Sequence, residues 1–189
     1  MVRYLAASTL VLLVMLVMIR TFQLKRLGIK AIQFGEKDKT DFLILPFAFL
    51  LFYIVFASAF DLPGIGVELF DDTFTGWIGA ILCVMGILLF IYALISFGKS
   101  FRVGLDEDHP GELVTTGAFS ISRNPIYTAF GLVLSGVFFI IPNWIILTYV
   151  FAGMWLFKRQ ILLEEQSLKG IYGEEYMAYC KKSQAVFII

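Results

Sequence analysis

Long uncharged apolar stretches separated by charged segments dominate the pattern of the chain. They cover residues 4–19, 42–60, 74–97 and 125–157. One membrane-spanning helix needs about 17 to 25 apolar residues. Each of the first three stretches therefore predicts a single span.

The fourth stretch is too long for one span. As a single helix, residues 125–157 would extend about 50 Å, whereas the hydrocarbon core of a bilayer is about 30 Å thick. Pro142 and Asn143 lie near its middle, and this pair favours a turn because proline lacks an amide donor and asparagine tolerates turn geometry. The pattern predicts an all-α integral membrane protein with five transmembrane helices, of which the last two form a short hairpin.

The distribution of basic residues orients these helices. All of the 15 Lys and Arg residues except Arg3 lie in residues 20–41, 98–124 and 158–189. Because basic loops stay in the cytoplasm, we expect the N-terminus outside and the C-terminus in the cytoplasm. A cleaved signal peptide is the alternative for the first stretch, but its basic residues follow the apolar run and no small-residue cleavage pattern intervenes.

Composition agrees with residence in a membrane. Of the 189 residues, 59% are apolar and 16% are charged, where a soluble domain has about 25% charged residues. The 15 Lys and Arg balance the 15 Asp and Glu, and without a basic surplus a nucleic-acid partner is disfavoured. No predicted span contains an ionisable Asp, Glu, Lys, Arg or His, which argues against a transporter or pump.

Neither a metal site nor covalent catalysis is indicated. Cys83 and Cys180 have neither disulfide nor metal-ligand spacing. His109 stands among acidic residues in a run typical of an exposed turn, and it has no orienting partner at useful spacing. We therefore expect no metal and assign no catalytic role to His109.

The predicted hairpin brings two distant polar segments to one membrane surface. If its arms are symmetric about the turn, Glu164 and Glu165 lie about one helical turn beyond Arg123. Topology alone therefore predicts a cluster of Arg123, Asn124, Tyr127, Glu164 and Glu165.

Four segments carry a resemblance to a known family. In chain order they are Leu113-Val114-Thr115-Thr116-Gly117-Ala118-Phe119, Arg123-Asn124-Pro125-Ile126-Tyr127, Glu164-Glu165 and Gly173-Glu174-Glu175-Tyr176-Met177-Ala178-Tyr179. By their order and spacing, residues 98–182 resemble the isoprenylcysteine carboxyl methyltransferase family of integral membrane enzymes, which are related to the phospholipid methyltransferases. The minimal loops favour a prokaryotic member in a plasma membrane.

The resemblance implies S-adenosylmethionine as the methyl donor, bound at the cytoplasmic ends of the helices, and a lipophilic acceptor that enters sideways from the bilayer. Glu164 would hold the amino group of the donor, for which a carboxylate is suited. By the same resemblance, Gln160 falls at a position that faces the acceptor. From their position beside the donor site, we also expect Arg123 and Glu165 to take part in catalysis, Arg123 by orienting an anionic group and Glu165 as a base. Besides Glu164, the residues expected to line the donor site are Leu113, Val114, Phe119, Asn124, Pro125, Ile126 and Tyr127.

The predicted spans and the family resemblance together indicate one structural domain with two parts. Residues 1–97 would carry the three N-terminal spans. Residues 98–189 would carry the donor-binding catalytic region, with the hairpin at 125–157 and a tail at the cytoplasmic interface.

Three residues depart from the family pattern. Asn124 replaces the usual His and cannot titrate, and Phe119 replaces a Tyr. Gln160 replaces an Arg, which weakens the case for a carboxylate acceptor because only Arg offers a charged bidentate fork.

The sequence therefore predicts an S-adenosylmethionine-dependent methyltransferase, with a prenylcysteine-type carboxylate as the first choice of acceptor. Phospholipid amines and thiols stay open as acceptors. Two other classes also stay open: an intramembrane reductase of the sterol type that uses NADPH, and a non-catalytic membrane scaffold with a degraded site.

Overall fold

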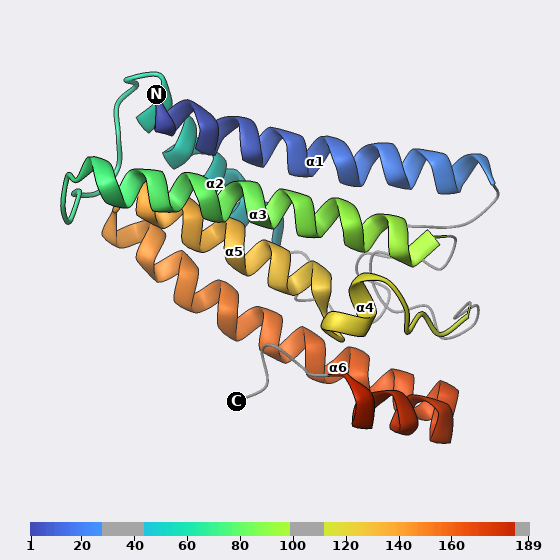
Figure 1. Cartoon of the computed structure of the whole chain (residues 1–189). Coiled ribbons are helices and arrows are strands. Elements are labelled where there is room, and N and C mark those ends of the chain that lie inside the picture. Colours follow the sequence, from blue (N-terminus) through green and yellow to red (C-terminus); the bar gives the residue numbers. More distant parts are fainter. Residues whose placement is uncertain (28–43, 99–111, 184–189) are drawn as a thin grey trace.

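The computed structural model describes residues 1–27, 44–98 and 112–183, and in these ranges the chain is helical (Figure 1). They contain no β-strand, only an isolated bridge between Glu68 and Asn143. The all-helical class is therefore confirmed for the described part. The helices are α1 (Val2–Arg26), α2 (Ile44–Ala59), α3 (Thr73–Phe97), α4 (Ala118–Ile121), α5 (Pro125–Ile140) and α6 (Trp144–Lys182).

Among the residues that the structure describes, three helices, α1, α3 and α6, are long and apolar enough to cross a membrane. The apolar helices α2 and α5 have 16 residues each, fewer than the roughly 20 that a span usually needs. Large apolar side chains are exposed along the long helices, for example Ile95 at 71% and Phe151 at 66%, and such a surface is suited to lipid. The number of spans and the orientation of the termini stay predictions.

Helices α3 and α5 pack through small residues. A Cβ atom on Gly136 would lie 2.7 Å from both the Gly79 carbonyl oxygen and the Cys83 sulfur. Cys83 itself is fully buried. Glycine at these positions lets two backbones approach closely, which is how apolar helices associate in membranes.

A turn at residues 141–143 joins α5 to α6, where the sequence predicts it. The Asn143 side chain caps α6, because its Oδ1 accepts a hydrogen bond from the Ile145 amide at 2.8 Å. Its Nδ2 donates to the Ile65 carbonyl oxygen, also at 2.8 Å. One side chain thus starts α6 and holds the loop that precedes α3.

The second arm of this hairpin is longer than the apolar pattern predicts. The pattern ends the hairpin at Phe157, but α6 continues as one helix to Gly173, whose φ of 50° and ψ of −119° interrupt it. The reason is that residues 158–169 contain no glycine or proline and are good helix formers. As Figure 1 shows, α6 runs beside α5 and then extends past the start of α5, near α4.

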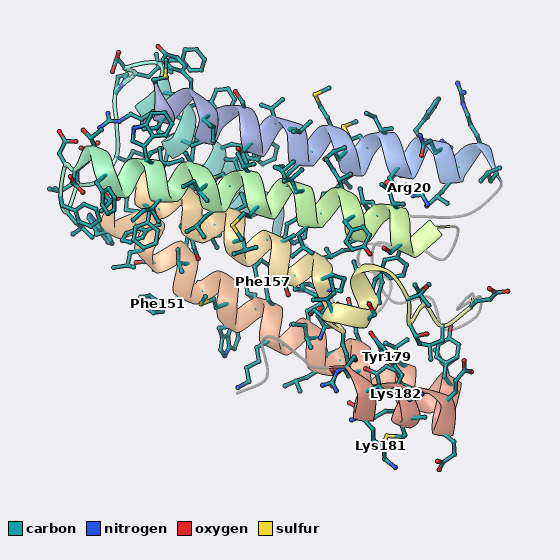
Figure 2. The ribbon with its side chains drawn as sticks, viewed as in Figure 1. Arg20, Phe151, Phe157, Tyr179, Lys181 and Lys182 are labelled. Atoms are coloured by element: carbon teal, nitrogen blue, oxygen red, sulfur yellow. The ribbon has the colours of Figure 1, made fainter. Side chains whose placement is uncertain are left out.

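The described polar residues of the predicted site gather at this end of the bundle. The short helix α4 follows Gly117, which has a φ of 63°, a conformation that favours glycine. The Ala118 amide donates to Ser96 Oγ at 3.0 Å and ties α4 to the end of α3. Figure 2 places Arg20, on α1, toward the same end as the last turns of α6.

Candidate functional site

Tyr127 and Glu164 connect the first turn of α5 to α6. The Tyr127 hydroxyl donates a hydrogen bond to Glu164 Oε1. Gln160, one turn earlier on α6, also hydrogen bonds to the Glu164 side chain. These three predicted residues form one polar group between the two arms of the hairpin, and we call it the Glu164 group.

Glu164 lies in the polar part of α6, beyond the apolar run that ends at Phe157. Burial away from water raises the pKa of its carboxyl to about 7, and the hydrogen bonds from Tyr127 and Gln160 oppose this rise. The carboxyl is therefore protonated more readily than an ordinary glutamate. A bound cation would favour the ionised form, so this site suits a ligand with a positive charge.

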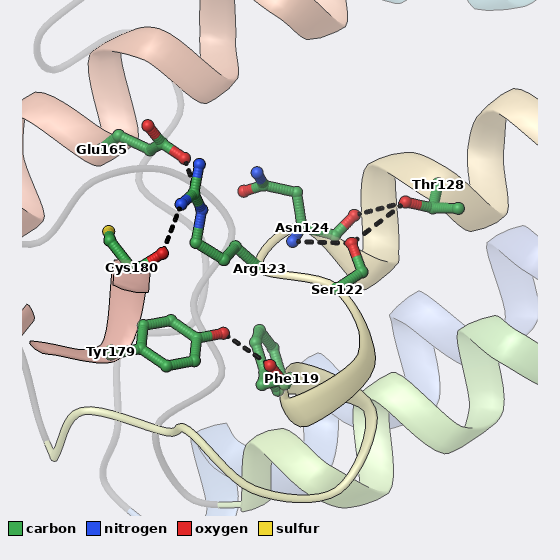
Figure 3. Close-up of polar contacts among 8 residues, drawn as sticks. All are labelled: Phe119, Ser122, Arg123, Asn124, Thr128, Glu165, Tyr179 and Cys180. Carbon is green, nitrogen blue, oxygen red and sulfur yellow. Dashed lines mark hydrogen bonds and ion pairs between the residues drawn. The ribbon is translucent and has the colours of Figure 1, made fainter. Parts of the chain in front are cut away.

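Arg123 holds three segments together. Its Nε lies 3.1 Å from Glu165 Oε1, and its Nη1 donates to the Cys180 carbonyl oxygen at 3.3 Å (Figure 3). The Nε–Oε1 contact is an ion pair without the alignment of a hydrogen bond. Only 15% of the Arg123 side chain and 8% of the Glu165 side chain are exposed. Removing either partner would leave a buried charge, which is costly.

Asn124 has unused binding capacity. It is 8% exposed, and although it is the N-cap residue of α5, its side chain makes no capping bond. Its backbone is held instead: the amide donates to Ser122 Oγ at 3.2 Å and the carbonyl accepts from Thr128 Oγ1 at 3.0 Å (Figure 3). Asn124 Nδ2 is buried and has no partner among the described residues. Such a donor costs about 1–3 kcal/mol, which an acceptor atom of a ligand would recover.

An aromatic cluster covers the loop before α5. Tyr176 and Tyr179, which are 1% and 8% exposed, pack against Phe119. The Tyr179 hydroxyl donates to the Phe119 carbonyl oxygen at 2.7 Å (Figure 3). Leu113 and Val114 pack against the same cluster. Three predicted donor-site residues, Leu113, Val114 and Phe119, thus pack together against the last turns of α6.

Two further predicted residues lie at the start of α5. Pro125 is buried and occupies the first helical turn, where its missing amide leaves no bond unmade. Ile126 is partly buried and packs against the main core. His109 lies outside the described residues.

Ile126 packs against the main core, but six other predicted residues form two groups: Tyr127 and Gln160 around Glu164, and Leu113 and Val114 around Phe119. Arg123 links them, because its partner Glu165 follows Glu164 and its partner Cys180 follows Tyr179. Their assembly at one end of the bundle agrees with the fold-back expected from the sequence. Their roles stay predictions.

Three aromatic residues near the site were not predicted from the sequence to belong to it. Tyr176 and Tyr179 recur at helical spacing, which marks one helix face but does not say what covers it. The Phe157 ring lies 5.7 Å from the Tyr127 ring and supports it from α6. Its place at the end of an apolar run gives no signal of this contact, because most residues there face lipid or core.

The site suits a ligand with a cationic and an apolar part. Glu164 supplies a carboxylate, the Asn124 side chain a buried amide donor without a partner among the described residues, and the cluster around Phe119 supplies packed apolar side chains beside them. In residues 1–27, 44–98 and 112–183, no group of three His, Cys, Asp or Glu side chains is placed to hold a metal ion.

A helical protein with a polar site at the end of an apolar bundle is the class that these observations define. Residues 74–175 match the phospholipid methyltransferase family, and the chain belongs to this family. The matched region runs from α3 into the last part of α6 and contains the whole Glu164 group. The family resemblance carried by the motifs is thereby confirmed.

Curated relatives are similar over 54–61% of the chain. A probable protein-S-isoprenylcysteine O-methyltransferase of Oryza sativa subsp. indica is 26% identical over 120 residues, which cover 61% of this chain and 62% of the relative. Protein-S-isoprenylcysteine O-methyltransferase B of Arabidopsis thaliana is 30% identical over 109 residues, covering 55% and 54%. The protein-S-isoprenylcysteine O-methyltransferase of Tribolium castaneum is 29% identical over 105 residues, covering 54% and 37%.

The chain therefore spans less than two thirds of the length of each of these relatives. No solved structure matches the chain.

Proposed function

We propose that the protein is a membrane methyltransferase that uses S-adenosylmethionine and acts on a lipophilic acceptor at the membrane–cytoplasm interface. The observation that carries this proposal is the Glu164 group at the end of an apolar bundle. The side-chain amide nitrogen of Asn124, which has no partner among the described residues, lies one turn before Tyr127. Membership of the phospholipid methyltransferase family supports the chemistry.

The distribution of basic residues supports the proposed cytoplasmic placement. Lys25 and Arg26 lie in the last turn of α1, and Lys181 and Lys182 in the last turn of α6. Basic residues at helix ends favour the cytoplasmic side. We therefore propose that α1 begins outside and that α6 ends in the cytoplasm.

The donor, when bound, supplies a methyl group carried on a positively charged sulfur. Glu164 would accept hydrogen bonds from its amino group, while Tyr127 and Gln160 keep that carboxylate in place. Asn124 Nδ2 would donate to one of its acceptor atoms. The remaining residues proposed to enclose it are Leu113, Val114, Phe119, Pro125 and Ile126.

The names of the relatives support a prenylcysteine-type carboxylate as the acceptor. A carboxylate is already nucleophilic at neutral pH and needs no general base. The chain would then contribute alignment and exclusion of water rather than proton transfer.

A phospholipid amine or a thiol is the second candidate, and one observation favours it. Gln160 hydrogen bonds to Glu164 and carries no charge, so its position offers no charged fork to a carboxylate. An amine or thiol must lose a proton before it attacks, and Glu165 is the proposed base. Proton uptake by Glu165 would weaken its ion pair with Arg123, which we propose positions the site.

Calorimetric titration of the purified protein in detergent with S-adenosylmethionine and with its demethylated product tests the proposal. We expect saturable binding of both, at least tenfold weaker in Glu164→Gln and unchanged in Glu174→Gln, which alters an exposed carboxylate on the same helix. Folded protein that binds neither compound would show that the proposal is wrong. Binding of NADPH instead would support the reductase.

A further inference from the structure

A cavity lies at the other end of the bundle, away from the Glu164 group. Its volume is about 310 Å³. Residues from the start of α1, the end of α2, the loop before α3 and the turn between α5 and α6 line it, and it is open on one side. Its apolar lining includes Ile54, Ala57 and Ile141, and its polar lining includes Arg3, Ser58, Asp61, Glu68 and Asn143.

The walls of the cavity are held by specific bonds. Asn143 binds the Ile65 carbonyl oxygen, and the Leu69 amide donates to the Pro142 carbonyl oxygen at 2.6 Å. The Tyr53 hydroxyl donates to the Pro63 carbonyl oxygen at 2.8 Å. The loop before α3 is therefore fixed at several points, and the cavity is a built feature of the fold.

The charges of the lining do not balance. Arg3 Nη2 pairs with Glu68 Oε1 at 2.9 Å, which neutralises one carboxylate. Asp61 has no ion-pair partner in the described part of the chain, and Ser58 Oγ is buried there without a hydrogen-bond partner. One guanidinium thus faces two carboxylates, so the cavity favours a ligand with a positive charge and hydrogen-bond donors.

Aromatic residues indicate the depth of this end in the membrane. Tyr4, Trp77 and Trp144 lie near the starts of α1, α3 and α6 and are 52%, 51% and 52% exposed. Exposed Trp and Tyr mark the level of lipid headgroups. A cavity at this level, lined by both apolar and charged side chains, fits the polar end of a lipid better than a freely soluble molecule.

We propose that this cavity binds the headgroup of a phospholipid with a primary ammonium group. The ammonium lies at Asp61 and Ser58, and the phosphate lies at the guanidinium of Arg3, which keeps N–H groups beyond the one that pairs with Glu68. This lipid is a bound partner and not the methyl acceptor, because the cavity and the Glu164 group lie at opposite ends of α5.

Native mass spectrometry of the full chain released from detergent measures this preference. The probes are phosphatidylethanolamine and phosphatidylglycerol with identical acyl chains. We expect the wild-type protein to retain the first lipid at least threefold more than the second. Asp61→Asn should abolish this preference. Because Asn tolerates the positive φ of 53° at this position, the variant removes the charge without straining the loop.

Asp71→Asn is the matched control, since Asp71 is an exposed carboxylate of the same loop that does not line this cavity. Equal retention of both lipids by the wild-type protein would overturn the proposal. So would a preference that survives Asp61→Asn. Glycerophosphoethanolamine, which lacks acyl chains, separates a lipid from a soluble ligand: if it competes as well as the lipid, the lipid assignment is wrong.

Discussion

The Arg123 guanidinium lies 3.1 Å from the Glu165 carboxylate and also donates to the Cys180 carbonyl oxygen. One side chain therefore joins the loop before α5 to two parts of α6, on either side of the break at Gly173. Both charges are mostly buried. This pair therefore helps to hold the residues around Glu164 and those around Phe119 in their relative position.

The effects of removing Arg123 and Glu165 on the free energy of unfolding should not be additive. Arg123→Gln leaves Glu165 as a buried unpaired charge, so we expect a loss of about 3 kcal/mol in the free energy of unfolding. Adding Glu165→Gln removes that charge, so the double variant should lose less than the sum of the single variants. Chemical unfolding of the four proteins in detergent gives the coupling energy. Additive losses would show that the two charges do not interact.

The hydrogen bond from Tyr179 to Phe119 makes a separate prediction. Tyr179→Phe leaves the Phe119 carbonyl oxygen without its donor, and we expect a loss of about 1–2 kcal/mol in stability. Tyr4→Phe is the matched control, because Tyr4 is 52% exposed and should tolerate the same change. Thermal unfolding of both variants in detergent compares them, and equal melting temperatures would contradict the contribution of this bond.

Two glycine substitutions should have opposite effects on stability, because one glycine lies where α3 and α5 approach closely and the other lies on an open part of α6. Gly136→Ala would place a Cβ 2.7 Å from the Gly79 carbonyl oxygen, and overpacking of this kind costs about 1–3 kcal/mol. Gly170→Ala meets nothing within 4 Å and should stabilise α6 by about 0.5–1 kcal/mol, because alanine is the better helix former. Thermal unfolding in detergent checks both signs. A stable Gly136→Ala protein would show that the helices separate at little cost.

The hairpin could be predicted because its signals are local. An apolar run too long for one span and the Pro142–Asn143 pair together indicate a fold-back, and the structure has a turn there. That fold-back is enough to bring Tyr127 to Glu164 and Arg123 to Glu165.

The side-chain pairings within the site could not be predicted from the sequence. Gln160 could face the acceptor or its own helix neighbour Glu164, and only the rotamers in the packed structure decide between them. The burial of Tyr176 and Tyr179 depends on the break at Gly173, which redirects the last turns of α6. A glycine can be accommodated in a helix or can end it, so its residue type did not settle this direction.

The raised pKa of Glu164 predicts that donor binding depends on pH. Its carboxyl has a pKa of about 7 because it is buried, and the proposed contact with the donor's amino group needs the ionised form. Donor affinity should therefore rise as the pH increases through about 7 and level off above it, and binding at neutral pH should release a proton. Calorimetry in two buffers with different enthalpies of ionisation counts that proton.

Burial raises the pKa of Glu164, and Tyr127 should shift the midpoint of this pH dependence downward. Its hydrogen bond lowers the pKa of Glu164, so Tyr127→Phe should raise that pKa and move the rise in affinity to higher pH. Glu164→Gln cannot release the proton, and its residual affinity should not change between about pH 6 and pH 8. A Tyr127→Phe profile that matches the wild-type profile would show that this bond does not control the charge of Glu164. Because the shift concerns the midpoint and not the maximum affinity, it separates control of ionisation from simple loss of a contact.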